Sequence, residues 1–286
     1  MEFRESSSEP QMLRHYASLF QTCFPTATHL DVRYLEWLYT KNPSGTVIGM
    51  DAWEGDRLAA HYVCVPGAAM LDGKRARVLL SLNTATHPDF QGKGIFTKLA
   101  DATYCAGAER GFSAVYGVAN ANSTPGFVRK LGFSLIAPLD AKVGVGRIDS
   151  HTPSEWMTRS SFYRAWDATA LRWRCSNPSR PYTLHRVSDD VLGASAATGK
   201  PLLCAWAELP PSCTEDFNRL ARPPWSLRLN LGLHPRISKR TSSGWFDVPS
   251  RMRSSPLNLI LRNLSDKPFA VEASNVIIGQ LDFDAF

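Results

Sequence analysis

A glycine turn between a strand-like run and a helical run constrains this chain more than any other segment. Residues 78–86 are mostly apolar or β-branched, and the His-Pro pair at 87–88 predicts the end of a strand, because proline cannot donate to a ladder. The turn Q-G-K-G at 91–94 then opens an amphipathic pattern over about 95–110. Two glycines spaced by one residue let a ligand approach the backbone closely, and the amides and dipole of the next helical turn favour a pyrophosphate.

The residues after this helix continue the alternation of strand and helix. Residues 112–120 predict a buried strand, and residues 122–133 predict a short helix with Pro125 in its first turn and Gly132 at its end. An isolated G-x-G turn is weak evidence for a ligand site. The ordered succession of strand, turn, helix, strand and helix is more specific.

This succession resembles the GNAT acyltransferase superfamily, whose phosphate loop has the form Q/R-x-x-G-x-G/A. The turn at 91–94 stands at the loop position, and residues 131–133 (Leu-Gly-Phe) match the end of the family's next helix. Asn120 and Asn122 stand where the family contacts the pantetheine arm of CoA. The specific resemblance covers residues 47–146, about a third of the chain.

Two residues depart from the family pattern. Phe96 stands where the last small residue of the loop is usual, so we expect the turn to be displaced although its amides remain. Val128 occupies the helix position where many members carry a tyrosine acid that protonates the leaving thiolate. The fold expectation survives both changes, but the usual mechanism lacks its acid.

The predicted elements follow the GNAT order, which implies an α+β fold with a mixed central sheet flanked by helices. Helices are predicted at 9–24 and 31–41, and strands at 47–53, 58–66 and 75–86. The phosphate turn, helix, strand and helix described above then complete the order. We assign residues 1–146 to this acyltransferase domain with its acyl-CoA loop.

The resemblance implies acyl transfer from acetyl-CoA or another acyl-CoA, as co-substrate, to an amine. The pantetheine would lie between strands 78–86 and 113–119, which would splay apart, and a backbone N–H near Ala85 or Thr86 would bind the thioester oxyanion. The expected cofactor-binding residues are Thr84, Ala85, Thr86, Gln91, Gly92, Lys93, Gly94, Ile95, Phe96, Thr97, Asn120, Asn122 and Ser123. No spacing of His, Cys or carboxylates indicates a metal site.

Polar residues on the central strands are the catalytic candidates, because a protonated amine must lose a proton before it attacks. These are His61, Ser81 and Asn83, with Tyr116 as an acid. Histidine has a suitable intrinsic pKa, whereas Asn83 cannot act as a base but can orient a water. A lone strand histidine is more often structural, and a tyrosine in this strand is more often core, so both interpretations stay open.

The second half of the chain contains a faint repeat of the first. The stretch at 34–44 resembles that at 170–179: each has a tryptophan in a helical run followed by Asn-Pro-Ser. Strand-like runs follow at 201–207, 226–231 and 257–262, but no Q-x-x-G-x-G turn occurs after residue 146. We interpret 147–286 as a degenerate GNAT-like or substrate-shaping lobe. The alternative is an extension of unrelated mixed fold.

Composition is that of an ordinary cytoplasmic chain, with 286 residues of which 44% are hydrophobic and 20% charged. No signal peptide or membrane span is visible, and the six cysteines are expected to be reduced, with zinc or disulfides the lesser alternative. The net charge of +6 arises mainly after residue 146, where 18 Lys and Arg face 13 Asp and Glu. No nucleic-acid motif accompanies this excess, so no nucleic-acid partner is expected. Anionic ligands or plain solvation explain the excess better.

Three functional hypotheses follow. The first is an N-acyltransferase, with acetyl the expected acyl group, acting on a small-molecule amine such as an amino sugar in a cleft between the lobes. The second is a transferase whose acyl donor is linked to a carrier protein or tRNA and docks on the basic half. The third is a non-catalytic acyl-CoA-binding protein. The oligomeric state stays open.

Overall fold

A mixed sheet of 15 strands, counted over the described residues, runs through the whole molecule. The computed structural model describes residues 1–148, 153–189, 191–209, 220, 222–223, 225–235, 244–253, 255–267 and 269–284. In chain order its first elements are β1 (Glu2–Glu5), α1 (Pro10–Cys23), α2 (Val32–Thr40), β2 (Ile48–Glu54), β3 (Arg57–Leu71), β4 (Lys74–Thr86), η1 (Pro88–Phe90), α3 (Ile95–Glu109), β5 (Ala114–Asn120), α4 (Thr124–Lys130), β6 (Ser134–Pro138) and β7 (Asp140–Gly144).

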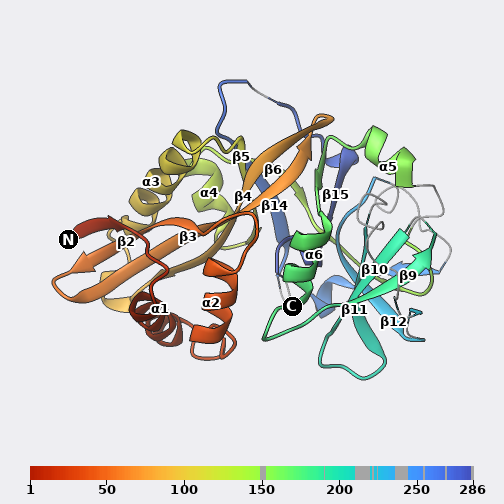
Figure 1. The fold of residues 1–286 in the computed structure, drawn as a ribbon, viewed down its shortest axis with the longest axis horizontal. Coiled ribbons are helices and arrows are strands. Elements are labelled where there is room, and N and C mark those ends of the chain that lie inside the picture. The colour runs from red at the N-terminus through yellow and green to blue at the C-terminus, as the bar shows by residue number, and fades with distance from the viewer. Residues whose placement is uncertain are drawn as a thin grey trace.

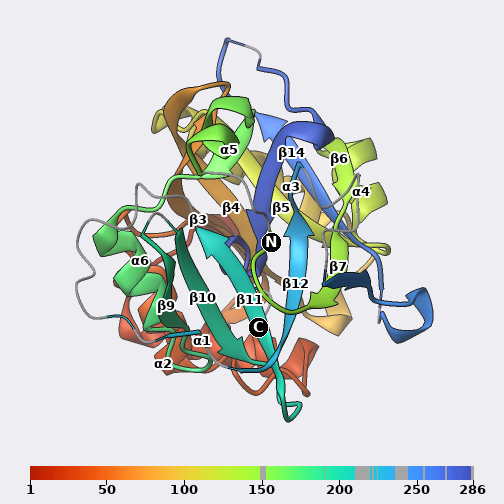
Figure 2. The ribbon, with the colours of Figure 1, turned by 90° about the vertical axis from the view of Figure 1, so that its right-hand side faces the viewer.

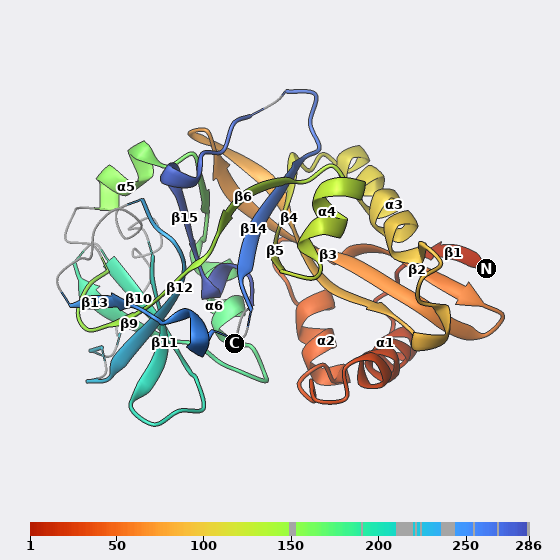
Figure 3. The ribbon, with the colours of Figure 1, turned by 180° about the vertical axis from the view of Figure 1, so that it is seen from behind.

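Helices cover both faces of the first part of the sheet. Helices α1 and α2 pack on one face, and α3 and α4 pack on the other (Figure 1 and Figure 3). Helix α2 begins where the Asp31 side chain accepts a hydrogen bond from the Tyr34 amide at 2.8 Å. Two separate apolar clusters, one under each helix pair, therefore sandwich the sheet. The predicted α+β class is confirmed.

The predicted strand over 58–66 is too short. Strand β3 continues through Pro66 to Leu71. Strand β2 pairs with β3 only as far as Cys64, so no β2 residue on that side requires an N–H from Pro66. Proline therefore does not end this strand.

Strands β4 and β5 pair in parallel and then separate. Their pairs run only from Val78↔Ala114 to Leu80↔Tyr116, although both strands, described in full, continue well beyond. A bulge follows on the other edge of β4, where Tyr62 pairs with Thr84 and Val63 with Leu82, leaving Asn83 as the extra residue with φ +52°. The predicted splay of these strands is thus present, with a bulge beside it.

The remaining elements, in chain order, complete the first sheet region and build most of a second one. They are α5 (Pro153–Arg159), β8 (Phe162–Arg164), α6 (Ala168–Cys175), β9 (Thr183–Ser188), β10 (Val191–Ala197), β11 (Leu203–Leu209), β12 (Leu227–Leu233), β13 (Trp245–Asp247), η3 (Ser250–Met252), β14 (Leu257–Asn263), η4 (Ala273–Asn275), β15 (Val276–Gly279) and η5 (Gln280–Asp282). We call β1–β6, β14 and α1–α4 the first lobe, and β7, β9–β13 and α6 the second lobe. Strands β8 and β15 connect the two sheets.

The second lobe repeats the strand order of the first. Strands β9, β10 and β11 form an antiparallel meander, and β12 lies parallel to β11 over three residue pairs, as β5 does to β4 (Figure 2). In the first lobe β14 lies antiparallel between β5 and β6, and in the second β7 lies antiparallel between β12 and β13. Each lobe thus receives this strand from the other half of the chain. The predicted division of the chain at residue 146 therefore does not coincide with the division into lobes, because β7 and β14 each pair with strands from the other side of that residue.

The two tryptophan helices meet at the junction of the lobes. The rings of Trp37 in α2 and Trp173 in α6 stack at 4.9 Å between centroids, and each indole N–H donates to the other's backbone carbonyl, at 3.1 and 3.2 Å. Asp167 caps the start of α6 as Asp31 caps the start of α2. In each case the carboxylate accepts a hydrogen bond from the backbone amide three residues later. The repeat seen in the sequence therefore lies on a local two-fold arrangement.

Candidate active site

The glycine turn is exposed and lies at the start of α3. Gly92 and Gly94 have φ of +77° and +70°, a region that favours glycine, and a Cβ at either position would meet no atom within 4 Å. The Gln91 side chain donates to the Thr86 carbonyl at 3.1 Å and so fastens the turn to the end of β4. Lys93 places its ammonium 4.9 Å from the Phe90 ring centre. The first amides of α3, including those of Ile95 and Thr97, face the turn and are available to an anion.

Phe96 packs below this turn, and the expected displacement of the turn remains a prediction. Its ring packs edge-on against Tyr62 at 5.7 Å and Phe127 at 5.4 Å between centroids. These contacts lie beneath the helix, between β3 and α4. The bulky residue therefore packs below the loop and leaves both glycines in the left-handed region.

Asn120 shapes the start of α4. Its Oδ1 accepts hydrogen bonds from the amides of Asn122 and Ser123, at 3.0 and 2.9 Å, and from the Ser123 hydroxyl at 3.1 Å. Asn120 and Asn122 are exposed at the carboxyl end of β5, beside the splay. Val128, further along α4, is exposed and brings no acid to this end of the sheet. The polar side chains at 120 and 123 thus hold one rim of the splay.

Ser81 lies at the first position of β4 beyond its parallel pairing with β5. A Cβ on Gly117, the facing β5 residue, would lie 3.2 Å from the Ser81 Cβ, so glycine keeps the strands close here. The Ser81 hydroxyl lies 2.7 Å from the Tyr62 hydroxyl, which lies 2.7 Å from the Tyr104 hydroxyl. Burial raises the pKa of Tyr62 well above its ordinary value, so the phenol stays protonated. This cluster is on the α3 face.

Asn83 leads to a buried chain of polar groups on the α2 face. Its amide nitrogen donates to the Tyr39 hydroxyl at 3.3 Å, and that hydroxyl lies 2.8 Å from Nε2 of His61. His61 Nδ1 lies 2.6 Å from Asp51 Oδ1, and Tyr16 donates its hydroxyl proton to Asp51 Oδ2 at 2.6 Å. His61 is fully buried, so the predicted base has no direct contact with a cleft.

Tyr39, Asp51 and Tyr16, which belong to this row of hydrogen-bonded groups, were not among the predicted site residues. The signal available was Asp51, a carboxylate in the middle of an otherwise apolar predicted strand. Such a residue needs a partner when buried. Tyr39 and Tyr16 belong to apolar helix faces, where a tyrosine is indistinguishable from core.

The end of β4 beyond the bulge is paired with β3. Ala85 is buried opposite His61, and Thr86 pairs with Ala60. The Thr86 carbonyl also accepts from the Cys23 thiol at 3.4 Å. The oxyanion role predicted near Ala85 or Thr86, and the cofactor role of Thr84, remain predictions.

Tyr116 lies at the junction of the lobes. Its hydroxyl donates to the Asp282 carbonyl at 2.7 Å and accepts from the Arg164 guanidinium, and its ring contacts Phe162. Burial raises its pKa. The hydroxyl is therefore engaged in the junction, on the paired side of the splay, and its role as an acid remains a prediction without a supporting contact.

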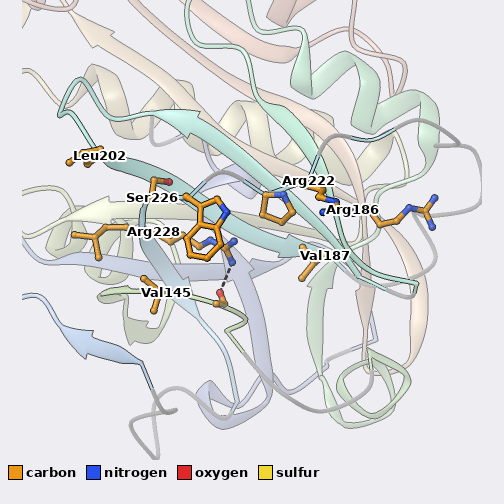
Figure 4. Close-up of a pocket in the computed structure, with 11 residues that line it drawn as sticks. Val145, Arg186, Val187, Leu202, Arg222, Ser226 and Arg228 are labelled. Atoms are coloured by element: carbon orange, nitrogen blue, oxygen red, sulfur yellow. Dashed lines mark hydrogen bonds between the residues drawn. The ribbon is translucent and has the colours of Figure 1, made fainter.

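A cavity of about 880 Å³ opens in the second lobe, away from the glycine turn (Figure 4). Its walls combine apolar side chains, including Val187 and Leu202, with the guanidinium groups of Arg186, Arg222 and Arg228. The Arg228 guanidinium lies 3.8 Å from the Trp206 ring centre and donates to the Gly146 carbonyl. Three of the arginines that make the second half of the chain basic thus line a single cavity.

Within the described residues, no group of three or more His, Cys, Asp or Glu side chains is placed to hold a metal ion. The described helices also include none that is both long and apolar enough to cross a membrane. The five described cysteines are free thiols, and Cys105 is exposed.

Comparison with known proteins agrees with this geometry. Residues 5–136 match the family model described as "Acetyltransferase (GNAT) domain". A probable N-acyltransferase of unknown function from Enterococcus faecalis V583 superposes with a TM-score of 0.57 at 10% identity, covering 92% of this chain and 73% of that one. A GCN5-related N-acetyltransferase from Anabaena variabilis gives 0.55 at 10% identity, with the same coverage.

Eis1 from Mycobacterium abscessus gives a TM-score of 0.51 at 12% identity, covering 92% of this chain and 74% of that one. No curated protein sequence matches this chain significantly. The likeness to these structures extends over both lobes, whereas the family model covers the first.

Proposed function

We propose that this protein transfers an acetyl group from acetyl-CoA to a small-molecule amine, because residues 5–136 match the family model of the GNAT acetyltransferase domain. The observation that supports the donor most strongly is the exposed turn at 92–94, which opens the first amides of α3 toward the splay between β4 and β5. The pyrophosphate would bind these amides and Lys93. The pantetheine would enter between the separating strands.

Val128 stands at the position of the usual tyrosine acid, so another group must supply the proton. Ser81 offers a hydroxyl for this role. It lies at the base of the splay and is hydrogen-bonded to the neutral phenol of Tyr62. When the C–S bond breaks, the thiolate would take a proton from Ser81, and Ser81 would recover one from the second proton that the amine nitrogen loses, so that Tyr62 stays neutral and only holds the Ser81 hydroxyl in place. The hydroxyl pair thus stands in for the missing acid.

The first experiment measures CoA affinity of the full chain by calorimetry. Gly94→Glu should weaken CoA binding by about 100-fold or more, because a carboxylate on the turn repels the pyrophosphate and blocks close approach. Gly73→Glu is the matched control, since Gly73 has φ +73° and equally open surroundings but lies in the β3–β4 hairpin. Unchanged CoA affinity in folded Gly94→Glu would overturn the cofactor site.

The second experiment measures release of CoA thiol from acetyl-CoA in the presence of glucosamine, spermidine, histamine or propylamine. Amine-dependent release supports the transferase, and an amino sugar among the accepted amines would support the acceptor class. CoA binding without release for any amine would favour the non-catalytic alternative. The arginine-lined cavity favours the carrier-linked alternative, for which an acidic acyl carrier would be used while free acetyl-CoA is not.

A further inference from the structure

We propose that Tyr39, His61 and Asp51 form a buried relay that removes the proton from the acceptor amine, with the Tyr39 hydroxyl as the group that meets the amine. The inference rests on the proposed acetyl transfer. It identifies how a fully buried histidine can serve as a base. None of the three side chains is more than 1% exposed.

The hydrogen bonds define the direction of the relay. A carboxylate only accepts hydrogen bonds, so His61 donates its Nδ1 proton to Asp51; Nε2 of neutral His61 then accepts from the Tyr39 hydroxyl at 2.8 Å, and that hydroxyl accepts from the Asn83 amide nitrogen. The proton of neutral His61 is then on Nδ1, 2.6 Å from Asp51. Carboxylate, imidazole and hydroxyl therefore stand in the same order as in a serine hydrolase triad, with a phenol in the place of the serine.

The surroundings hold this order rigidly. Both Asp51 oxygens accept further hydrogen bonds, Oδ1 from the Ser6 hydroxyl at 2.7 Å and Oδ2 from the Tyr16 hydroxyl at 2.6 Å. The Tyr16 ring stacks on the His61 ring at 3.8 Å between centroids, and the Phe20 ring meets it edge-on at 5.8 Å. The titratable groups that face His61 are thus Asp51 from β2, Tyr16 from α1 and Tyr39 from α2. The imidazole has one orientation available.

Asn83, which is half-buried, links the relay to the part of β4 that no longer pairs with β5. Asn83 is the unpaired bulge residue, and its amide nitrogen sits on the Tyr39 oxygen at the long distance of 3.3 Å. The Asn83 N–H therefore occupies the position on the Tyr39 oxygen at which the ammonium of the acceptor would donate its proton. In the ternary complex the amine replaces this amide on Tyr39, and Asn83 turns aside to hold the amine's other protons.

The chemistry balances through two separate protons. The ammonium gives its first proton to the Tyr39 oxygen while the Tyr39 proton passes to His61 Nε2, and the Asp51 carboxylate stabilises the imidazolium. The free amine then forms a C–N bond to the thioester carbon, and the C–S bond breaks with the electron pair leaving on sulfur. The amide nitrogen loses its second proton, which accounts for the thiol formed. Burial raises the pKa of Tyr39, so the phenol conducts the proton without holding a charge.

The test compares Tyr39→Phe with Tyr34→Phe. Both remove one buried hydroxyl from α2, but the Tyr34 hydroxyl bonds to Asp284 at the junction of the lobes. With acetyl-CoA and propylamine, Tyr39→Phe should lower kcat about 100-fold, the contribution typical of a positioned base, with CoA affinity unchanged. With hydroxylamine, which is already unprotonated at neutral pH, the loss should be less than about tenfold, because no ammonium proton has to be removed.

Equal losses with the two amines, or a loss no larger than that of Tyr34→Phe, would overturn the relay while leaving the transferase intact. Absence of turnover in the wild type would instead overturn the proposed function. Should Tyr39→Phe not fold, His61→Gln carries the same comparison. An acceptor-independent measurement is the ¹⁵N spectrum of His61, for which we expect a proton on Nδ1, and a proton on Nε2 would contradict the relay.

Discussion

Ser81 and Asn83 lie two residues apart in β4, yet they serve opposite faces of the sheet. Ser81 contacts Tyr62 on the α3 face, and Asn83 contacts Tyr39 on the α2 face. In a regular strand, residues i and i+2 point to the same side. The extra residue at the bulge breaks this alternation. In the proposed mechanism, one short segment would therefore present a hydroxyl to the leaving thiolate and an amide to the incoming amine.

At this scale we expect Ser81→Ala to lower kcat by about 100-fold, because a general acid contributes roughly that factor or more. CoA affinity should be unchanged, since the hydroxyl acts only when the C–S bond breaks. Steady-state kinetics with acetyl-CoA and an accepted amine measure both quantities. Ser134→Ala, at an exposed position in β6, is the control. A wild-type kcat in Ser81→Ala would remove Ser81 from the mechanism.

At the scale of elements, α2 and α6 bind the two halves of the chain together. Arg174 of α6 adds to the Trp37–Trp173 contact, since it pairs with Asp284 at 2.7 Å, and Asp284 in turn accepts from Tyr34 of α2. All three charged or polar groups are largely buried, so their hydrogen bonds are costly to break. We call the contact between α2 and α6 the clamp, because it holds the two lobes together and supports α2, the helix that carries Tyr39.

We expect Trp37→Ala to lower the free energy of unfolding by about 3–5 kcal/mol, the cost of truncating a buried tryptophan. Trp37 is 5% exposed and loses both its ring stack and its N–H partner. Trp225→Ala is the control, because Trp225 is fully exposed and its loss should change stability by less than about 0.5 kcal/mol. Urea unfolding of the full chain measures both, and equal values would contradict the clamp.

At the scale of the whole molecule, the second lobe keeps the strand order of the first, but the Asn230 side chain of β12 bridges to β11 where the first lobe has its splay. One residue beyond the parallel pairs, where the first lobe has Ser81 and Gly117, the second has Trp206 and Asn230. Trp206 is fully buried, and its carbonyl accepts from the Asn230 side chain at 3.1 Å. This supports a degenerate second lobe without a CoA of its own, so calorimetry should give one CoA per chain.

The exchange of β7 and β14 makes the lobes interdependent. Strand β14 pairs with β5 over seven residues and buries Leu259, Ile260 and Leu261. We therefore expect a fragment of residues 1–146 to lack a cooperative unfolding transition, because the loss of β14 exposes the edge of β5 and opens the core. Fusing residues 255–267 to it through a flexible linker should restore part of the transition in circular dichroism. A fragment that unfolds cooperatively and binds CoA without β14 would contradict this.

Features that depend only on neighbouring residues could be predicted from the sequence alone. The glycine turn, the strand before it and the helix after it follow from residue spacing and backbone preference, and so does the repeated tryptophan helix with its Asn-Pro-Ser end. These are local properties, and the structure reproduces their order within a few residues. The acyltransferase fold was predictable because its signals lie in one continuous stretch.

Which polar groups contact one another could not be predicted, because it depends on how distant segments pack. His61 was predicted to line a cleft, but pairing of β2 with β3 and packing of α1 and α2 bury it between Tyr16 and Tyr39. The strand predicted at 257–262 was assigned to the second half of the chain, yet its hydrogen bonds are made to β5, more than a hundred residues away. Strand partners and burial depend on contacts between distant segments, and neither residue spacing nor local propensity carries that information.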